Sequence, residues 1–192
     1  MKQICDLKIK NEIEKIVNSD LSQEKYMIIA HLASLNSLDP NSKTGACIVS
    51  KDGEVISIGW NAMPPIGKFP WEREGKEENT KYPYVVHAER MAIYNAIMDG
   101  QVEKLENASI YVNLFPCNQC MQQVAIYNLS ALYYDSDKYH DSPFSKEARF
   151  IIKELKKGRK DGFICKQINI NKNILDNYKS LKESINEKVG NY

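Results

Sequence analysis

The chain has 192 residues, enough for one domain with a buried core and too few to argue for two. Its 26 Lys and Arg against 25 Asp and Glu leave a net charge of +1, without the positive field that gathers DNA or RNA. No run approaches the roughly 18 apolar residues of a membrane span, and the charged start MKQICDLKIKNEIEK differs from the apolar core of a signal peptide. We therefore expect a cytoplasmic protein with no nucleic-acid or membrane partner.

The first third of the chain predicts two helices and a β-hairpin. Residues 11–19 form a short amphipathic pattern, and Ser22 is a plausible N-cap for a second helix over 23–37. An apolar run in 39–50, a turn at KDG and an alternating pattern in 54–60 then read as two paired strands.

Residues 61–83 separate the hairpin from the rest of the chain. They carry four prolines, two glycines and many charges, so we expect a long irregular segment, which in a compact domain is often functional. Beyond it we expect helices over 87–100, 116–128, 145–158 and 171–192, and strands over 108–114, 131–135 and 163–170. Strands that alternate with helices predict an α/β sandwich with a partly parallel sheet, in which sites form where strand ends meet helix starts.

One histidine and two of the five cysteines are spaced as metal ligands. His87 and Cys117 each stand where a helix is expected to begin, because Pro83 precedes the first helix and Pro116 directly precedes the second. Cys117 and Cys120 share one face of a helical turn, and a helix N-terminus favours the thiolate. Three protein ligands would leave the fourth tetrahedral position to water, which is the catalytic pattern for Zn²⁺.

Glu89 lies two residues beyond the candidate histidine ligand. Zinc lowers the pKa of a bound water from 15.7 toward about 7, and Glu89 can accept the proton and pass one to a ring nitrogen and a leaving amine. H-x-E followed by P-C-x-x-C is the established signature of the zinc nucleobase deaminases, and the sequence contains both parts of it. In the alternative, a closed structural zinc site, His140 or a leftover cysteine would be the fourth ligand and Glu89 would have no role.

Six stretches carry a more specific resemblance. They are DPNSKTGACIV, GWNAMP, FPW, TKYPYVVHAE, YVNLFPCNQC and SDKYHD, in this order between Asp39 and Asp141. In them the chain resembles the deoxycytidylate branch of the cytidine and deoxycytidylate deaminase family. The resemblance implies a three-layer α/β/α fold with a mixed central sheet of about five strands. It implies one zinc-dependent deaminase domain over residues 1–192, with its core at about 21–170 and helical extensions at both ends.

The same resemblance implies hydrolysis of dCMP to dUMP and ammonia, which supplies a precursor of thymidylate, by a homo-oligomer, either a dimer or a hexamer. The residues it assigns are the zinc ligands His87, Cys117 and Cys120, the catalytic Glu89, and the substrate contacts Asn61, Ala88 and Tyr139. Asn61 would meet a sugar hydroxyl, with a turn asparagine as the alternative. Tyr139 would lie close to the phosphate, with an aromatic ring covering the core as the alternative.

The chain departs from the branch at two places. Arg90 and Met91 stand where the branch usually has Leu-Asn, and PIGK at 65–68 replaces a longer stretch associated with regulation by dCTP and dTTP. Arg90 could meet a phosphate, but its position about 100° around the helix from Glu89 favours a surface ion pair. The alternatives to dCMP are a free nucleoside, a modified dCMP or a base in nucleic acid as substrate, or a catalytically silent nucleotide-binding module.

Overall fold

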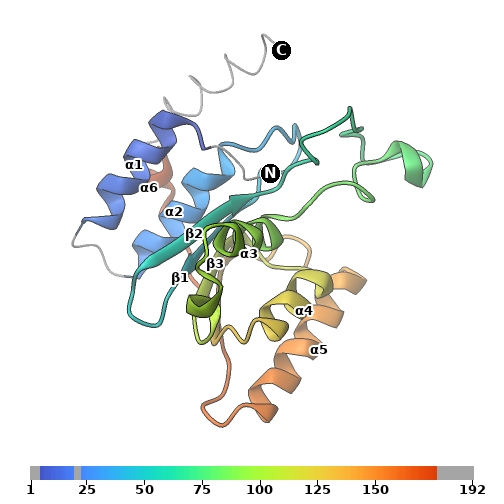
Figure 1. Ribbon diagram of the computed structural model, residues 1–192. Coiled ribbons are helices and arrows are strands. Elements are labelled where there is room, and N and C mark those ends of the chain that lie inside the picture. Colours follow the sequence, from blue (N-terminus) through green and yellow to red (C-terminus); the bar gives the residue numbers. More distant parts are fainter. Residues whose placement is uncertain (1–4, 20–22, 177–192) are drawn as a thin grey trace.

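A five-stranded sheet forms the middle layer of the computed structural model, which describes residues 5–19 and 23–176 (Figure 1). The strands are β1 (Gly45–Val49), β2 (Val55–Trp60), β3 (Ser109–Leu114), β4 (Ala131–Ser136) and β5 (Ile164–Gln167). Their order is β2-β1-β3-β4-β5, in which β1 pairs antiparallel with β2 and β3, while β3, β4 and β5 run parallel. This mixed sheet confirms the predicted fold class.

Helices cover both faces of the sheet (Figure 1). One face carries α1 (Leu7–Val17), α2 (Glu24–Ser34) and α6 (Lys172–Asp176), and the other carries α3 (Ala88–Met98), α4 (Asn118–Ile126) and α5 (Pro143–Gly158). Two short 3-10 helices, η1 (Glu77–Asn79) and η2 (Val102–Leu105), lie in the connections. None of the described helices combines the length and the apolar character needed to cross a membrane.

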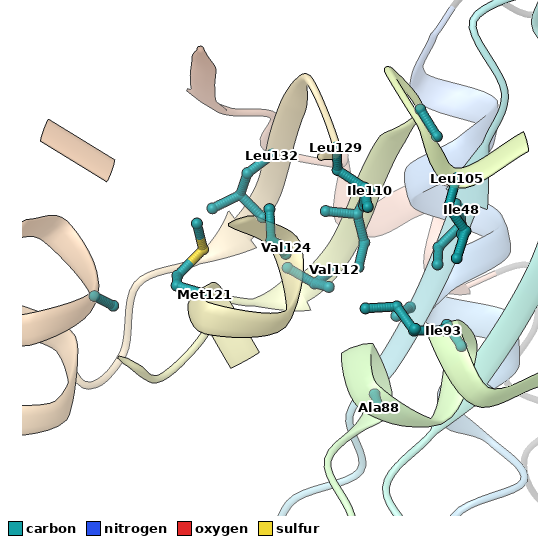
Figure 2. Packing of buried hydrophobic residues seen from close by; sticks show 14 of the residues in the cluster. Ile48, Ala88, Ile93, Leu105, Ile110, Val112, Met121, Val124, Leu129 and Leu132 are labelled. Atoms are coloured by element: carbon teal, nitrogen blue, oxygen red, sulfur yellow. The ribbon is translucent and has the colours of Figure 1, made fainter. Parts of the chain in front are cut away.

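Alternation along the strands builds a separate core on each face. Ile110 and Val112 of β3 point toward α3 and α4, whereas Tyr111 between them points toward α2. Figure 2 shows the first of these cores, where side chains from three helices meet the sheet; its labelled members are Ile48, Ala88, Ile93, Leu105, Ile110, Val112, Met121, Val124, Leu129 and Leu132. The second core stacks Tyr111 on Tyr133 with ring centroids 4.6 Å apart. Both faces of the central strands are therefore buried, whereas the edge strand β5 is mostly exposed.

Element boundaries differ from the predictions at the N-terminal end. The first helix begins at Leu7, earlier than residue 11, because the Asp6 side chain caps it by accepting a hydrogen bond from Lys8 N at 2.9 Å. The second helix ends at Ser34, three residues early, and the predicted cap Ser22 lies outside the described residues. The predicted helix over 171–192 is described only as far as Asp176, and η2 was not anticipated.

Two glycines allow helices to approach the sheet closely. A Cβ atom on Gly59 of β2 would lie 2.3 Å from the backbone nitrogen of Ala92 and 2.5 Å from the carbonyl oxygen of Ala88, both in α3. A Cβ on Gly45 of β1 would lie 2.0 Å from the carbonyl oxygen of Ala30 in α2. Since these neighbours are backbone atoms, they can only move together with their helices.

Gly59→Ala is predicted to lower the free energy of unfolding by about 1–3 kcal/mol, because the added methyl group must push α3 off the sheet. Urea denaturation measures this directly. Gly158→Ala is the matched control, since nothing lies within 4 Å of a Cβ at that helical position. The control should be unchanged or slightly more stable, and a Gly59→Ala protein as stable as the wild type would contradict the close approach.

Candidate active site

The first turns of α3 and α4 meet at one point. His87 is the N-cap residue of α3 and Cys117 is the N-cap residue of α4, and both have extended backbone conformations. The Nδ1 atom of His87 lies 3.4 Å from Sγ of Cys117 and 3.4 Å from Sγ of Cys120, and the two sulfurs are 3.7 Å apart. The predicted helix starts and the convergence of these three side chains are thus found in the structure.

These separations fit a tetrahedral zinc ion. Zn–S bonds of about 2.3 Å and Zn–N bonds of about 2.0–2.1 Å give S···S and S···N separations of roughly 3.8 and 3.6 Å at tetrahedral angles. Among the described His, Cys, Asp and Glu side chains, these three, His87, Cys117 and Cys120, form a group whose ligand atoms all lie within 4.8 Å of one another. Cys5, Cys165 and His140 do not belong to it, so a closed four-ligand site is not formed there. The donor set fits Zn²⁺ with one position left open.

The sheet fixes the places of both helix starts. The parallel register pairs Leu114 of β3 with Ser136 of β4, and the amide of Phe115 donates to the carbonyl of Ser136 at 2.8 Å, just before α4. On the other side, Ala62 and Val86 exchange hydrogen bonds of 3.1 and 2.9 Å, which anchors the residue immediately before His87. Backbone hydrogen bonds therefore fix the positions in the chain from which His87 and Cys117 extend their side chains.

The local electrostatics prepare Cys117 for metal binding. Hydrogen bonding with Cys120 and with His87 outweighs burial and lowers the pKa of the Cys117 thiol to about 4. Burial disfavours the charged form of His87, but its hydrogen bond with Cys117 and the charge of Glu89 prevail and raise the pKa of the imidazole. The thiolate form that a metal requires is therefore favoured at Cys117.

Glu89 lies in the first turn of α3 and is only 3% exposed. Burial raises the pKa of its carboxyl group, partly offset by the positive charge of His87. The carboxyl group is also within hydrogen-bonding reach of the Cys120 thiol, which places it beside the ligand cluster. A buried carboxyl group with a raised pKa is suited to hold and release a proton near neutral pH.

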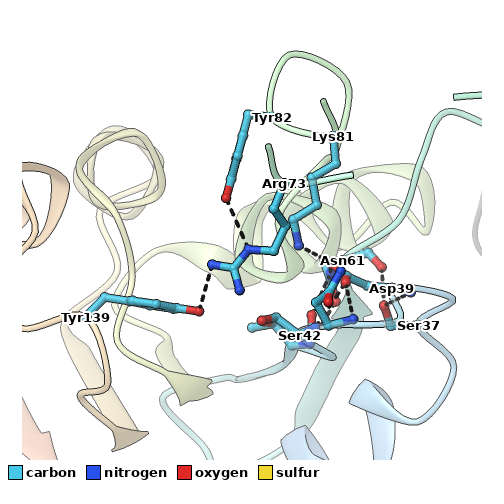
Figure 3. A network of polar contacts seen from close by, with 10 residues as sticks. Ser37, Asp39, Ser42, Asn61, Arg73, Lys81, Tyr82 and Tyr139 are labelled. Carbon is cyan, nitrogen blue, oxygen red and sulfur yellow. Dashed lines mark hydrogen bonds and ion pairs between the residues drawn. The ribbon is translucent and has the colours of Figure 1, made fainter. Parts of the chain in front are cut away.

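Asn61 sits in a buried polar network (Figure 3). Its Oδ1 accepts from the Thr44 amide at 2.7 Å, and its Nδ2 donates to Asp39 Oδ2 and to the Ser42 carbonyl, each at 3.0 Å. Lys81 forms an ion pair with the same Asp39 carboxylate, which is fully buried. Because both amide hydrogens of Asn61 are used, its spare capacity is one lone pair on Oδ1.

The motif SDKYHD contributes two separate clusters. The hydroxyl of Tyr139 accepts a hydrogen bond from Nη2 of Arg73 at 3.3 Å (Figure 3). His140 and Arg149 both bind Asp137, at 2.8 Å and at 2.5–2.7 Å. His140 therefore takes part in a hydrogen-bonded cluster around Asp137, and Tyr139 faces a cation.

Ala88 and Arg90 flank Glu89 on α3. Ala88 is fully buried, and its amide lies in the first helical turn, where backbone N–H groups have no partner within the helix. Arg90 donates to the hydroxyl of Tyr94, one turn along, at 3.1 Å. Among the described residues it forms no ion pair, so the surface ion pair favoured from its helical position is not formed.

Asp39, Lys81 and Arg73 lie in these networks although no motif in the sequence marked them as functional residues. Asp39 and Lys81 occur in motifs shared with the family, DPNSK and TKYP, which was the available clue. Arg73 stands between two glutamates in the irregular segment, a pattern typical of a solvated loop.

Comparison with known proteins agrees with this geometry. The family model of the cytidine and deoxycytidylate deaminase zinc-binding region matches residues 21–135. Deoxycytidylate deaminase of Pongo abelii is 41% identical over 133 residues, 67% of this chain and 72% of the relative, and the Homo sapiens protein is 40% identical with the same coverage. A crystal structure of dCMP deaminase from the cyanophage S-TIM5, in complex with dCMP and dUMP, has a TM-score of 0.56 at 24% identity and covers 76% of this chain and 96% of that one. The last comparison supports the fold.

The ligand cluster predicts the metal content of the purified protein. The wild type should carry about one zinc per chain, and Cys117→Ser or His87→Ala should lose most of it, because two remaining ligands bind zinc far more weakly. Elemental analysis after dialysis provides the measurement. Cys165→Ser, which removes a thiol from outside the cluster, should keep its zinc. Full zinc occupancy in Cys117→Ser would refute the assignment.

The buried ion pair predicts an asymmetric response to mutation. Asp39→Ala should cost about 3–5 kcal/mol of unfolding free energy, because it leaves Lys81 buried and unpaired. Lys81→Met should cost less, since the Asp39 carboxylate still accepts from Asn61 Nδ2 and from the amides of Asn41 and Ser42 at 2.8 and 3.0 Å. Urea denaturation of the two variants compares the costs, and a larger loss for Lys81→Met would be contrary to this network.

Proposed function

Since the chain belongs to the cytidine and deoxycytidylate deaminase family, we propose that it hydrolyses dCMP to dUMP and ammonia, with zinc as cofactor. The observation that carries the proposal is the cluster of His87, Cys117 and Cys120 with the buried carboxyl group of Glu89 beside it. We assign dCMP as the substrate because the relatives that are about 40% identical over two thirds of the chain are deoxycytidylate deaminases.

In this proposal His87, Cys117 and Cys120 hold the metal and Glu89 moves protons. When bound, zinc supplies Lewis-acid activation of a water molecule, whose pKa falls from 15.7 toward about 7. Glu89 takes a proton from the attacking water and delivers it to the ring nitrogen N3; it then takes the remaining proton from the hydroxyl group formed on C4 and delivers it to the amino nitrogen. The new bond joins the water oxygen to C4, the bond from C4 to the amino nitrogen breaks, and ammonia leaves with dUMP as the other product. The raised pKa of Glu89 supports this role, because the carboxyl group must both accept and return the proton.

The proposed substrate contacts have different capacities for hydrogen bonding. Asn61 can accept a hydrogen bond from a sugar hydroxyl through the free lone pair of Oδ1, but it cannot donate while its present contacts persist. The Ala88 amide at the helix start can donate to a carbonyl oxygen of the base. Tyr139 is proposed to lie on the phosphate side of the substrate.

The proposal includes the wider setting expected from the sequence. The partner is a small nucleotide, the location is the cytoplasm, and residues 1–192 act as one deaminase domain that assembles as a homo-oligomer. Apolar side chains such as Phe150 of α5 and Ile126 of α4 are well exposed in the single chain, which favours a second copy as a neighbour.

Glu89→Gln is predicted to lower kcat for dCMP by about 10²–10⁴-fold while zinc is retained, because the amide cannot carry the proton. Turnover is followed by ultraviolet absorbance on dCMP, CMP, deoxycytidine, dCTP and a deoxycytidine oligonucleotide. Glu103→Gln on η2, an exposed carboxylate, serves as the matched control and should keep the wild-type rate.

Two outcomes would contradict the proposal. A normal rate in Glu89→Gln would remove the proposed proton carrier. Faster turnover of the oligonucleotide than of dCMP would move the substrate from free nucleotides to nucleic acid.

A further inference from the structure

Asp39 is a fully buried carboxylate that joins two parts of the chain (Figure 3). Its Oδ1 accepts from the amides of Asn41 and Ser42 at 2.8 and 3.0 Å, which closes a local turn. Its Oδ2 accepts from Nδ2 of Asn61 at 3.0 Å and from the ammonium group of Lys81. The two oxygens thus have different tasks, and the second one is directed at residues that are distant in the sequence.

The side-chain amide of Asn61 has two orientations, related by a turn of about 180° that exchanges its oxygen and its nitrogen. Its neighbours select one of them, because the N–H of Thr44 needs an acceptor, while the Asp39 carboxylate and the Ser42 carbonyl need donors. In the turned orientation Nδ2 would face the N–H of Thr44, and Oδ1 would face two oxygen atoms. Buried polar groups would then lose their partners, which is costly.

The backbone of Asn61 is held on both sides. Its carbonyl oxygen accepts from the hydroxyl of Ser37 at 2.8 Å, and the oxygen of that hydroxyl accepts in turn from the Asp39 amide at 3.2 Å. The Asn61 amide donates to the carbonyl oxygen of Thr44 at 3.0 Å, which continues the pairing of β1 with β2. Rotation of the side chain is therefore the freedom left to Asn61, and the Asp39 carboxylate restricts that rotation.

Asn61 lies at the edge of the sheet from which the zinc ligands extend. It directly follows β2, and the next residue, Ala62, exchanges hydrogen bonds with Val86, which precedes His87. The partner of β2, strand β1, also pairs with β3, which leads into Cys117. The orientation of the Asn61 amide therefore bears on any ligand that binds at this edge.

We propose that Asp39 is a positioning residue of the site, which holds the Asn61 amide so that a ligand meets Oδ1 as an acceptor and no donor. The site then reads the sugar as a hydrogen-bond donor. The single sugar hydroxyl of dCMP, at the 3′ position, can satisfy the free lone pair of Oδ1, whereas a sugar without it leaves that lone pair unpaired. Lys81 compensates the charge of Asp39 without setting the amide orientation. This inference rests on the proposed function, in which Asn61 accepts from a sugar hydroxyl.

The test compares binding of dUMP with binding of 2′,3′-dideoxyuridine 5′-monophosphate, which lacks the 3′-hydroxyl group and otherwise equals dUMP. Neither compound carries the amine that the reaction removes, so binding is measured without turnover. Isothermal calorimetry on the zinc-loaded wild type is expected to show tighter binding of dUMP. The ratio of the two affinities is the readout, because a general loss of stability would weaken both ligands alike and would leave the ratio unchanged.

The double variant Asp39→Asn with Lys81→Met should reduce this ratio about 3- to 10-fold. The new side-chain oxygen must accept from the amides of Asn41 and Ser42, so its NH₂ group faces Asn61 and no longer favours the present orientation. The second substitution avoids a buried lysine without a partner, so the protein is expected to fold. Asn61→Ala, which leaves the ion pair in place, should reduce the ratio by the same factor and serves if the double variant does not fold.

Lys81→Met alone is the matched control. It keeps the Asp39 carboxylate, which still accepts from Asn61, so the ratio should stay at the wild-type value although the unfolding free energy falls. This separates a positioning role from a purely structural one, because the control loses stability and the double variant loses selectivity.

Several results would overturn the inference: a wild type that binds both ligands equally, an unchanged ratio in the double variant or in Asn61→Ala, or the same reduction in Lys81→Met. If the wild type deaminates dCMP and the ratio does not respond, the inference fails and the proposed function stands. If the ratio responds as expected and the wild type does not deaminate dCMP, the positioning by Asp39 stands and the proposed function fails.

Discussion

The convergence of two helix starts on one point is the constraint on which the rest of the structure depends. The start of α4 is set by the parallel pairing of β3 with β4, and the start of α3 is set by its close approach to Gly59 on β2. Since His87 and Cys117 are the N-cap residues of these helices, their positions follow from the backbone. A ligand set built in this way is as rigid as the sheet beneath it, which is what a fixed metal geometry requires.

A second constraint acts on the irregular segment between β2 and α3. This segment has few buried apolar side chains, so polar contacts replace a hydrophobic anchor. Asp39, Lys81 and Asn61 form a buried and mutually satisfied network, and the bridge from Ala62 to Val86 closes the segment next to His87. Buried polar groups are costly unless every one of them is paired. The pairing therefore fixes a loop that lies beside the site, as functional loops on rigid scaffolds generally do.

The sequence predicted those features of the fold and the site that depend on residues close together in the chain. The spacing of Cys117 and Cys120, the prolines before the helices and the alternation in the strands each depend on a few neighbouring residues, and the structure confirms the elements they predicted. Contacts between distant residues left no local pattern: Lys81 meets Asp39 across 42 positions, and Arg73 meets Tyr139 across 66. The capping of α1 by Asp6 was missed because the apolar period alone does not mark a cap.

His87, Cys117 and Cys120 together provide for a zinc site with three protein ligands and one open position. Zinc X-ray absorption spectroscopy of the purified protein tests it most directly, because the first coordination shell reports the kind and number of donor atoms. We expect two sulfur donors at about 2.3 Å and two nitrogen or oxygen donors at about 2.0–2.1 Å, one of which is exchangeable. A shell of three or four sulfur donors, or one with no exchangeable ligand, would indicate a closed structural site and would contradict an open zinc position.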